Sequence, residues 1–268
     1  MSTARFFHGH DGLLCDLDGV VYAGAGAIPG AVESLAALIE AGIPVAFVTN
    51  NASRSPQTVA HHLRDLGVPT DAEHVFGSAQ AGVALLRQHV AAGASVLAVG
   101  SDYLAGLLGE SGYRVVGSAS DRPDAVVQGF DPSVGWAQLA EAAYAVNAGA
   151  VWIATNLDLS IPRAEGVAPG NGALVGAVSH ATGTCPVAAG KPEPHLFQTA
   201  ARELGLVNPL VVGDRLDTDI RGGNAAGFDT VMVLTGIDTR QSAEQAPEAD
   251  RPGWIVDDMT ALAAEIDR

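Results

Sequence analysis

Residues 13–22, with the sequence LLCDLDGVVY, constrain the fold more than any other part of the chain. A short apolar run bounded by a glycine is typical of a central strand of a parallel sheet, buried on both faces. Asp16 and Asp18 then lie at the carboxyl end of this strand, the edge where open α/β sheets bind ligands. Two carboxylates so close together stay ionised only if a cation joins them; otherwise one of them holds a proton. A plain turn at the strand end is the alternative that this segment leaves open.

Composition limits the classes of partner. The chain has 268 residues, enough for one large domain or for a core with a second, smaller domain. Its formal net charge of -16, with 14 basic residues, argues against a nucleic acid or an anionic membrane as partner, because phosphate groups in such partners need clustered lysine and arginine. Two cysteines give no disulfide framework, no signal-like segment begins the chain, and the apolar runs are too short to span a bilayer. We expect a cytoplasmic globular protein.

Strand-like and helix-like segments alternate after the opening strand. Residues 43–51 are predicted to form a second buried strand that ends in Thr49, Asn50 and Asn51, and residues 55–67 a helix. This βαβα order predicts an α/β fold, a doubly wound parallel sheet with helices on both faces. Because parallel strands present their carboxyl ends on one side, the polar residues of both strand ends are expected to converge.

A second alternating series begins after residue 90. It has enough apolar residues for its own small sheet, so we expect residues 91–186 to form an inserted, smaller α/β domain and residues 1–90 and 187–268 to form the core. Within the insertion, residues 157–172 make a loop too long and turn-rich for a mere connector. Loops of this kind often carry binding residues.

The first pattern resumes after the insertion. Lys191 stands between a short apolar segment and a helix, and a further buried strand ends in an acidic segment that contains Asp214, Asp217 and Asp219. Asp217 has a second interpretation, as the N-cap of the helix that follows. Four strand ends therefore contribute polar groups to one edge of the predicted sheet.

Taken in order, DLDGV, VTNN, GKPEP and GDRLDTDI resemble the four motifs of the haloacid dehalogenase (HAD) superfamily of phosphohydrolases. The resemblance spans nearly the whole chain, and the insertion between the second and third motifs resembles the C2-type cap domain of the NagD-like and p-nitrophenylphosphatase-like subfamily. It implies a Rossmann-like HAD core and Mg²⁺-dependent hydrolysis of a small phosphomonoester through an aspartyl-phosphate. Asp18 favours a phosphatase, because the superfamily's transport ATPases carry threonine there and its dehalogenases lack the acid. The superfamily's phosphomutases have a small helical cap after the first motif. In this chain the segment between the first motif and the next predicted helix is too short for such a cap.

The resemblance also implies roles for the residues that match the motifs. Asp16 is the expected nucleophile and Asp18 the general acid and base. Mg²⁺ is expected on the carboxylates of Asp16 and Asp214 and the backbone carbonyl of Asp18. Lys191 neutralises charge on the nucleophile and the phosphate, and Asp219 orients Lys191 or the metal's waters. The residues expected to contact the phosphoryl group, of which Thr49 and Lys191 also count as catalytic, are Gly19, Thr49, Asn50, Asn51 and Lys191.

Substrate choice is expected in the cap loop, because a cap over the sheet edge selects the leaving group. The residues expected there are Asp158, Ile161, Pro162 and Arg163. Segments such as TNNASRS and PGNG resemble actinobacterial NagD-type glycerol-3-phosphate phosphatases, so the resemblance implies glycerol 3-phosphate as the lead substrate. Phosphoglycolate, pyridoxal phosphate and nucleotide monophosphates stay open, as does a catalytically weak binding or regulatory module on the same fold. Subfamily relatives often dimerise through the cap, so a homodimer also stays open.

Two further interpretations concern single residue types. Trp136 and Trp152, in a predicted helix and a predicted strand of the insertion, are expected to pack in its core. The histidines His8, His10, His61 and His62 lack neighbours with which to bind a metal and are taken as structural or solvated.

Overall fold

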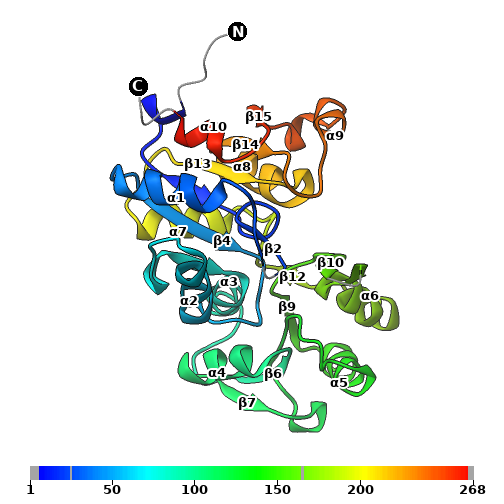
Figure 1. Ribbon diagram of the computed structural model, residues 1–268. Coiled ribbons are helices and arrows are strands. Elements are labelled where there is room, and N and C mark those ends of the chain that lie inside the picture. The colour runs from blue at the N-terminus through cyan, green and yellow to red at the C-terminus, as the bar shows by residue number, and fades with distance from the viewer. Residues whose placement is uncertain (1–5, 25, 164–165, 265–268) are drawn as a thin grey trace. The chain divides into compact units, whose positions relative to one another are not determined.

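The chain divides into two compact units (Figure 1). The computed structural model describes residues 6–24, 26–163 and 166–264 and, for His8, Pro162 and Arg163, the backbone alone. Unit 1 comprises Met1–Thr49, Pro56–Phe76 and Lys191–Arg268, and unit 2 comprises Asn50–Ser55 and Gly77–Gly190. The domain boundaries after residues 90 and 186 stay a prediction, because a compact unit need not be a part that folds on its own.

A largely parallel sheet forms the centre of unit 1. Within the described residues it has six strands, in the order β15-β14-β13-β1-β4-β5. Strand β1 pairs in parallel with both β13 and β4, so that Leu13 faces Leu210 on one side and Val45 on the other. The strands are β1 (Leu13–Cys15), β4 (Val45–Thr49), β5 (Val75–Gly77), β13 (Leu210–Gly213), β14 (Asp229–Val233) and β15 (Trp254–Val256). This register brings the residues after β1 and β13 to the same edge as the end of β4, as the sequence predicts.

Helices pack on this sheet through apolar stripes. In α1, Leu35 and Leu38 lie on one helix face and pack in the same core as Leu13 and Phe47 of the sheet. Helix α1, near the start of the chain, contacts α10, near its end, as Figure 1 shows in blue and red. The helices of unit 1 are α1 (Ala31–Glu40), α2 (Pro56–Leu66), α7 (His195–Glu203), α8 (Arg221–Ala226), α9 (Arg240–Glu244) and α10 (Thr260–Ala263). Short helical turns are η1 (Phe6–His8), η2 (Ala72–His74), η5 (Glu248–Asp250) and the π-helical turn η4 (Leu216–Ile220).

Unit 2 has a sheet of its own. Its described strands form a five-stranded sheet in the order β12-β9-β8-β6-β7, and every neighbouring pair is parallel. The strands are β6 (Ser95–Val99), β7 (Arg114–Val116), β8 (Ala125–Gln128), β9 (Val151–Ala154) and β12 (Val187–Ala188). The helices are α3 (Ser78–Leu86), α4 (Asp102–Glu110), α5 (Trp136–Asn147) and α6 (Asn171–Thr182), with the helical turn η3 (Ala119–Asp121). The expected α/β character of the insertion is therefore confirmed.

The two faces of this second sheet carry different cores. Val127 and Ile153 pack with α3 and α4, whereas Val126 and Trp152 pack with α5 and α6. Trp152 is buried, as predicted. The expectation for Trp136 is wrong, because this residue is 78% exposed. It lies nine positions before Ala145, a buried residue of α5, which puts the two about 180° apart around the helix.

Two short antiparallel hairpins complete the secondary structure. One joins β2 (Tyr22–Ala23) to β3 (Gly26–Ala27) in unit 1. The other pairs β10 (Ser160–Arg163) with β11 (Gly166–Pro169) in unit 2, within the segment 157–172 that was expected to be a loop. Among the helices of the described ranges, none has both the length and the apolar character needed to cross a bilayer.

Candidate active site

The end of β1 places Asp16 in the interior of unit 1. Its backbone amide continues the sheet by donating to Val212 O at 2.9 Å, and its side chain is buried. The chain then turns sharply, since Leu17 O accepts from the amides of both Val21 and Tyr22. As a result Asp18, two residues beyond Asp16, is exposed. The two carboxylates of this segment therefore stand in different surroundings, one buried and one in contact with solvent.

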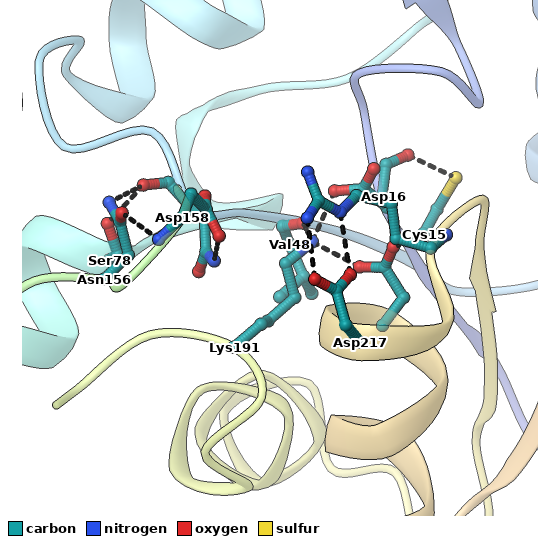
Figure 2. Close-up of polar contacts among 11 residues, drawn as sticks. Cys15, Asp16, Val48, Ser78, Asn156, Asp158, Lys191 and Asp217 are labelled. Carbon is teal, nitrogen blue, oxygen red and sulfur yellow. Dashed lines mark hydrogen bonds and ion pairs between the residues drawn. The ribbon is translucent and has the colours of Figure 1, made fainter. Parts of the chain in front are cut away.

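Lys191 is the only lysine in the chain, and it is buried beside Asp16. Its Nζ donates to Asp16 Oδ1 at 2.5 Å, to Asp219 Oδ1 at 2.6 Å and to Val48 O at 3.2 Å. Figure 2 shows the side chain pointing at Asp16 and Val48. Burial lowers the pKa of Lys191, but the two carboxylates outweigh it and raise that pKa above its ordinary value, so the ammonium is charged.

Asp214 follows β13 and is almost fully buried. Its Oδ2 accepts from the backbone amide of Ile237 at 2.8 Å, whereas Oδ1 is buried and has no hydrogen-bond partner among the described residues. Burial, followed by the Asp219 carboxylate, raises the pKa of Asp214 to about 7. A buried carboxylate oxygen without a partner is costly unless a cation or a proton satisfies it.

Three carboxylates converge around the single ammonium group. Asp16, Asp214 and Asp219 each offer an oxygen within 4.8 Å of the others. Burial, and then the charge of Asp219, also raise the pKa of Asp16, while Lys191 opposes the shift. With all three ionised the cluster has more negative than positive charge, and its donors are the oxygen ligands that Mg²⁺ prefers. The predicted metal ligands Asp16 and Asp214 therefore fit a hard divalent cation.

Asp219 contacts Lys191 directly. Besides accepting from Lys191, its carboxylate accepts from the backbone amide of Arg215 at 3.2 Å. Asp217, two residues earlier, instead points to Arg215, which donates to its two oxygens at 3.0 and 2.8 Å. Residue 215, not Asp217, is the N-cap of the π-helical turn η4, so the N-cap interpretation of Asp217 is wrong.

The polar residues after β4 fall into different units. Thr49 is the last residue of the strand and is buried in unit 1. Asn50 belongs to unit 2, where its Nδ2 donates to Asp158 Oδ1 at 3.0 Å and its carbonyl accepts from Ser78 Oγ and Asn156 Nδ2 at 2.6 and 2.7 Å (Figure 2). The Asn50 side chain and carbonyl are thus tied to the loop that contains Asp158.

Asn51 shapes the turn that follows. Its Oδ1 accepts from the amides of Ser53 and Arg54 at 2.8 and 3.1 Å and from Ser53 Oγ at 3.0 Å. This is the pattern by which an asparagine side chain stabilises a local turn. The side-chain oxygen of Asn51 is therefore engaged with its own loop.

The residues expected to choose the substrate lie in β10 and just before it, and their role stays a prediction. Asp158 accepts from Asn50, and Ile161 is half-buried in β10. The side chains of Pro162 and Arg163 lie outside the described residues. Sequence reasoning did not single out the segment from Thr235 to Asp238, although a glycine shortly after a buried strand, here Gly236, is a turn signal that could have drawn attention to it.

Comparison with known proteins shows that most of the chain is similar to phosphatases. Residues 13–114 match the family model described as haloacid dehalogenase-like hydrolase, and residues 188–262 match one described as HAD-hydrolase-like. The D-glycerol 3-phosphate phosphatase of Mycobacterium tuberculosis is 47% identical over 253 residues, which cover 94% of this chain and 71% of that protein. The 5'-nucleotidase YutF of Bacillus subtilis is 36% identical over 94% of this chain and 96% of its own length.

A solved structure agrees with this match. The crystal structure of glycerol phosphate phosphatase Rv1692 from Mycobacterium tuberculosis in complex with magnesium has a TM-score of 0.90 to this chain and is 47% identical to it. The match covers 94% of this chain and 76% of that one. Sequence and fold therefore point to the same group of proteins.

Proposed function

The chain belongs to the haloacid dehalogenase-like hydrolase family and is a phosphoric monoester hydrolase, and we propose that its substrate is glycerol 3-phosphate. The substrate proposal is supported by the 47% identity to a D-glycerol 3-phosphate phosphatase across 94% of this chain. For the chemistry, the observation that carries the proposal is the single buried lysine between the carboxylates of Asp16 and Asp219.

Asp16 is the proposed nucleophile. Lys191 holds its Oδ1, which leaves Oδ2 as the oxygen that attacks phosphorus. The new O–P bond forms an aspartyl-phosphate as the bond from phosphorus to the leaving alcohol breaks. The positive charge of Lys191 offsets the repulsion between this carboxylate and the phosphoryl oxygens.

Asp18 is the proposed general acid and base. Its exposed position suits a group that exchanges protons with substrate and water. In the first step it gives its proton to the leaving oxygen of glycerol. In the second step it takes a proton from the water that attacks the aspartyl-phosphate, which releases inorganic phosphate and restores Asp16.

Mg²⁺ is the cofactor, and we propose that Asp16, Asp214 and the backbone carbonyl of Asp18 hold it. When bound, the ion supplies positive charge against the phosphoryl oxygens. The partnerless Oδ1 of Asp214 supports this assignment. Asp219 is proposed to orient Lys191, which it contacts at 2.6 Å.

The remaining assignments are part of the same proposal. Phosphoryl contacts are proposed for Gly19, Thr49, Asn50 and Asn51. For Asn50 and Asn51 we favour the backbone amide as the contacting group, because the side-chain amide of Asn50 and the side-chain oxygen of Asn51 have hydrogen-bond partners of their own. Substrate choice is proposed for Asp158, Ile161 and Arg163. A homodimer and a cytoplasmic location also stay proposals, whereas a small phosphorylated metabolite is the partner that the activity requires.

The test is phosphate release from a panel of esters, with and without Mg²⁺. The panel contains glycerol 3-phosphate, phosphoglycolate, pyridoxal phosphate, a nucleotide monophosphate and p-nitrophenyl phosphate. We expect the highest kcat/KM for glycerol 3-phosphate, and we expect Asp16→Asn to lower kcat by about 10⁴-fold or more. Asp65→Asn, an exposed carboxylate on α2, is the matched control that keeps wild-type turnover.

Two results would contradict the proposal at different levels. A higher kcat/KM for the nucleotide monophosphate, the substrate class named for the 36% identical relative, would replace glycerol 3-phosphate as substrate. Undiminished turnover by Asp16→Asn would remove the proposed nucleophile.

A further inference from the structure

We propose that the segment Thr235, Gly236, Ile237 and Asp238, which follows β14, is a positioning device that decides which oxygen of Asp214 faces the metal ion. We call it the 235–238 loop. The inference rests on the proposed function, in which Asp214 is a metal ligand. None of the four residues was expected to take part in the site.

The first support is the unequal treatment of the two carboxylate oxygens. Ile237 donates its backbone N–H to Asp214 Oδ2 at 2.8 Å, so this oxygen is satisfied by the protein. Oδ1 is equally buried but has no hydrogen-bond partner among the described residues. An aspartate can rotate its carboxylate, and the amide of Ile237 opposes that rotation by holding one oxygen. The 235–238 loop thus reserves Oδ1 for a ligand.

The second support is steric. Asp214 lies between Gly236 and Gly19, and a Cβ atom added to either glycine would overlap the Asp214 carboxylate. Gly19 has a positive φ of 87°, which alone favours glycine there. The φ of Gly236 is not in that region, so its backbone conformation does not require glycine. Space for the carboxylate is the reason for glycine at position 236.

The third support is that the loop is tied to both strand ends of the site. Thr235 Oγ1 donates to Gly19 O at 2.7 Å, which links the loop to the turn that carries Asp16 and Asp18. The backbone amide of Asp238 donates to Asp214 O at 3.2 Å. These contacts join Asp214 to the turn after β1 through the 235–238 loop.

Asp238 anchors the far end of the loop. Its Oδ2 accepts from the backbone amide of Leu216 at 2.8 Å, and its Oδ1 accepts from Ser242 Oγ at 3.0 Å. Both of its oxygens therefore have protein partners, which distinguishes Asp238 from Asp214. Asp238 holds the loop, and Asp214 is the carboxylate with an oxygen to offer.

This arrangement predicts an effect on the choice of metal ion as well as on affinity. Mg²⁺ demands near-ideal octahedral geometry, whereas Ca²⁺ accepts more varied arrangements of oxygen ligands. A methyl group at position 236 displaces the Asp214 carboxylate without removing it. Binding of Mg²⁺ should therefore weaken more than binding of Ca²⁺, which a general loss of folding would not produce.

The experiment is calorimetric titration of Mg²⁺ and of Ca²⁺ into the full chain, which measures binding without turnover. We expect Gly236→Ala to raise the Kd for Mg²⁺ about 10–100-fold, and the Kd for Ca²⁺ by less. Thr235→Val, which removes only the hydrogen bond to Gly19, should raise the Kd for Mg²⁺ by a smaller factor. The matched control is Gly9→Ala, an exposed glycine of unit 1 with open space around its added Cβ, and its Kd should equal that of the wild type.

Each outcome decides the inference. Equal Mg²⁺ affinity in wild type, Gly236→Ala and Thr235→Val overturns it, as does an equal loss of Mg²⁺ and Ca²⁺ binding in Gly236→Ala. If Gly236→Ala does not fold, Thr235→Val decides by the same measurement. A wild-type chain that binds Mg²⁺ but hydrolyses no phosphomonoester contradicts the proposed function and leaves the positioning of Asp214 supported.

Discussion

Each unit buries a group of polar side chains near the carboxyl ends of its parallel strands, and the two groups differ in charge. The charged cluster of unit 1 contains Asp16, Lys191, Asp214 and Asp219. The neutral cluster of unit 2 contains Gln128, Thr155, Asn156 and Asn171. Every one of these residues is at most 7% exposed. Position and burial are therefore shared, and the chemistry is not.

The neutral cluster connects backbone segments of unit 2. Asn171 Nδ2 donates to Asn156 O at 2.8 Å and to Gln128 O at 3.4 Å, and Asn156 Nδ2 donates to Asn50 O at 2.7 Å. The side-chain amides of Asn156 and Asn171 thus satisfy carbonyls where a strand or loop ends. Such a cluster organises loops and offers no group that changes charge near neutral pH.

The charged cluster is arranged to bind a cation. Burying charges costs more than their mutual attraction returns unless the pairing is complete, and here three carboxylates face one ammonium group. Burial first, and then the charge of Asp219, raise the pKa values of Asp16 and Asp214. Buried polar side chains near a strand end therefore do not indicate a catalytic site by themselves, whereas a buried excess of one charge does.

Removing the charge of Lys191 should have the largest effect. Lys191→Met leaves Asp16 and Asp219 buried without their partner, which should lower the free energy of unfolding by about 3–5 kcal/mol. It also removes the cation beside the nucleophile, so kcat should fall by about 10³-fold or more. Urea unfolding and phosphate release measure the two effects. Adding Asp219→Asn should recover part of the stability and none of the activity; recovery of activity would contradict the role of Lys191.

The wild-type chain allows a direct check on this lysine. Because there is one lysine, labelling with ¹³Cε-lysine gives a single side-chain NMR signal. The raised pKa of Lys191 predicts that this signal does not titrate through the range in which a free lysine loses its proton, near pH 10.5. The raised pKa of this lysine adds stability that is present at pH values below the pKa of the unfolded state and is lost as the pH rises through the pKa of the folded state. A signal that titrates at the ordinary value would show that the ion pairs are absent.

Removing the metal ion should have the next largest effect, and only on unit 1. At an ion concentration of about 100 times Kd, bound Mg²⁺ stabilises by about 2.7 kcal/mol, so a chelator should lower Tm by about 5–10 °C. Protons compete for Asp214, whose pKa is about 7. In the metal-free chain this raised pKa favours the folded state at acid pH, and that contribution is lost as the pH rises from about 4 to 7. The chelator effect should therefore be largest above pH 7, and an effect that grows toward acid pH would contradict it.

Truncating Asn171 should have a smaller effect, confined to stability. Asn171→Ala removes the donor to the buried carbonyl of Asn156, which should cost about 1–3 kcal/mol. The Gln128 carbonyl still accepts from the backbone amide of Thr155 at 2.8 Å. Hydrogen exchange should show the loss of protection in β8, β9 and α6. Asn147→Ala, at the exposed end of α5, is the control and should change little. A loss spread evenly over both units would contradict the local role of the neutral cluster.

Replacing Gln128 should have the smallest effect, and in the opposite direction. Both polar atoms of its side chain are buried without a hydrogen-bond partner among the described residues, while its carbonyl is the group that Asn171 uses. Gln128→Met keeps the size and removes two unsatisfied atoms, which should raise the free energy of unfolding by about 1 kcal/mol. Urea unfolding measures the change. A loss of stability instead would indicate that the Gln128 amide binds internal water.

Part of the charged cluster could be predicted from sequence, because Asp16 and Asp214 directly follow short buried strands of the unit 1 sheet. The expectation that Lys191 stands at the end of a strand of the same sheet is wrong, because the strand before it, β12, pairs with β9 in unit 2. The apolar runs before Asp16, Thr49 and Asp214 set the strands, and parallel order sets the common edge. Lys191 required more than pattern, since a lysine before a helix has no special meaning until its motif is recognised. The contact between Lys191 and Asp219 depends on tertiary packing.

The contacts of the neutral cluster and of the 235–238 loop were beyond sequence reasoning for a different reason. Their hydrogen bonds use backbone groups, the carbonyl of Gln128 and the amide of Ile237. Because residues of every type have such a carbonyl, and all but proline such an amide, the residue type does not reveal these contacts. Trp136 was misplaced because the helix that contains it was recognised but its buried face was not. Asp158 was expected to face a substrate, and its bond to Asn50 shows a structural partner that spacing does not reveal.

The position of β1 between β4 and β13 has a consequence for how the enzyme is made. Leu13 pairs with Val45, a near neighbour in the chain, and with Leu210, which the ribosome adds only after all of unit 2. Until then the strand that carries Asp16 lacks one of its partners, and Lys191, Asp214 and Asp219 have not all been synthesised. A nascent chain therefore exposes an unpaired strand edge during the synthesis of unit 2, a condition that favours aggregation. It also gains its reactive aspartate in working form only after unit 2 has been made, so a nascent chain that ends within unit 2 cannot consume substrate.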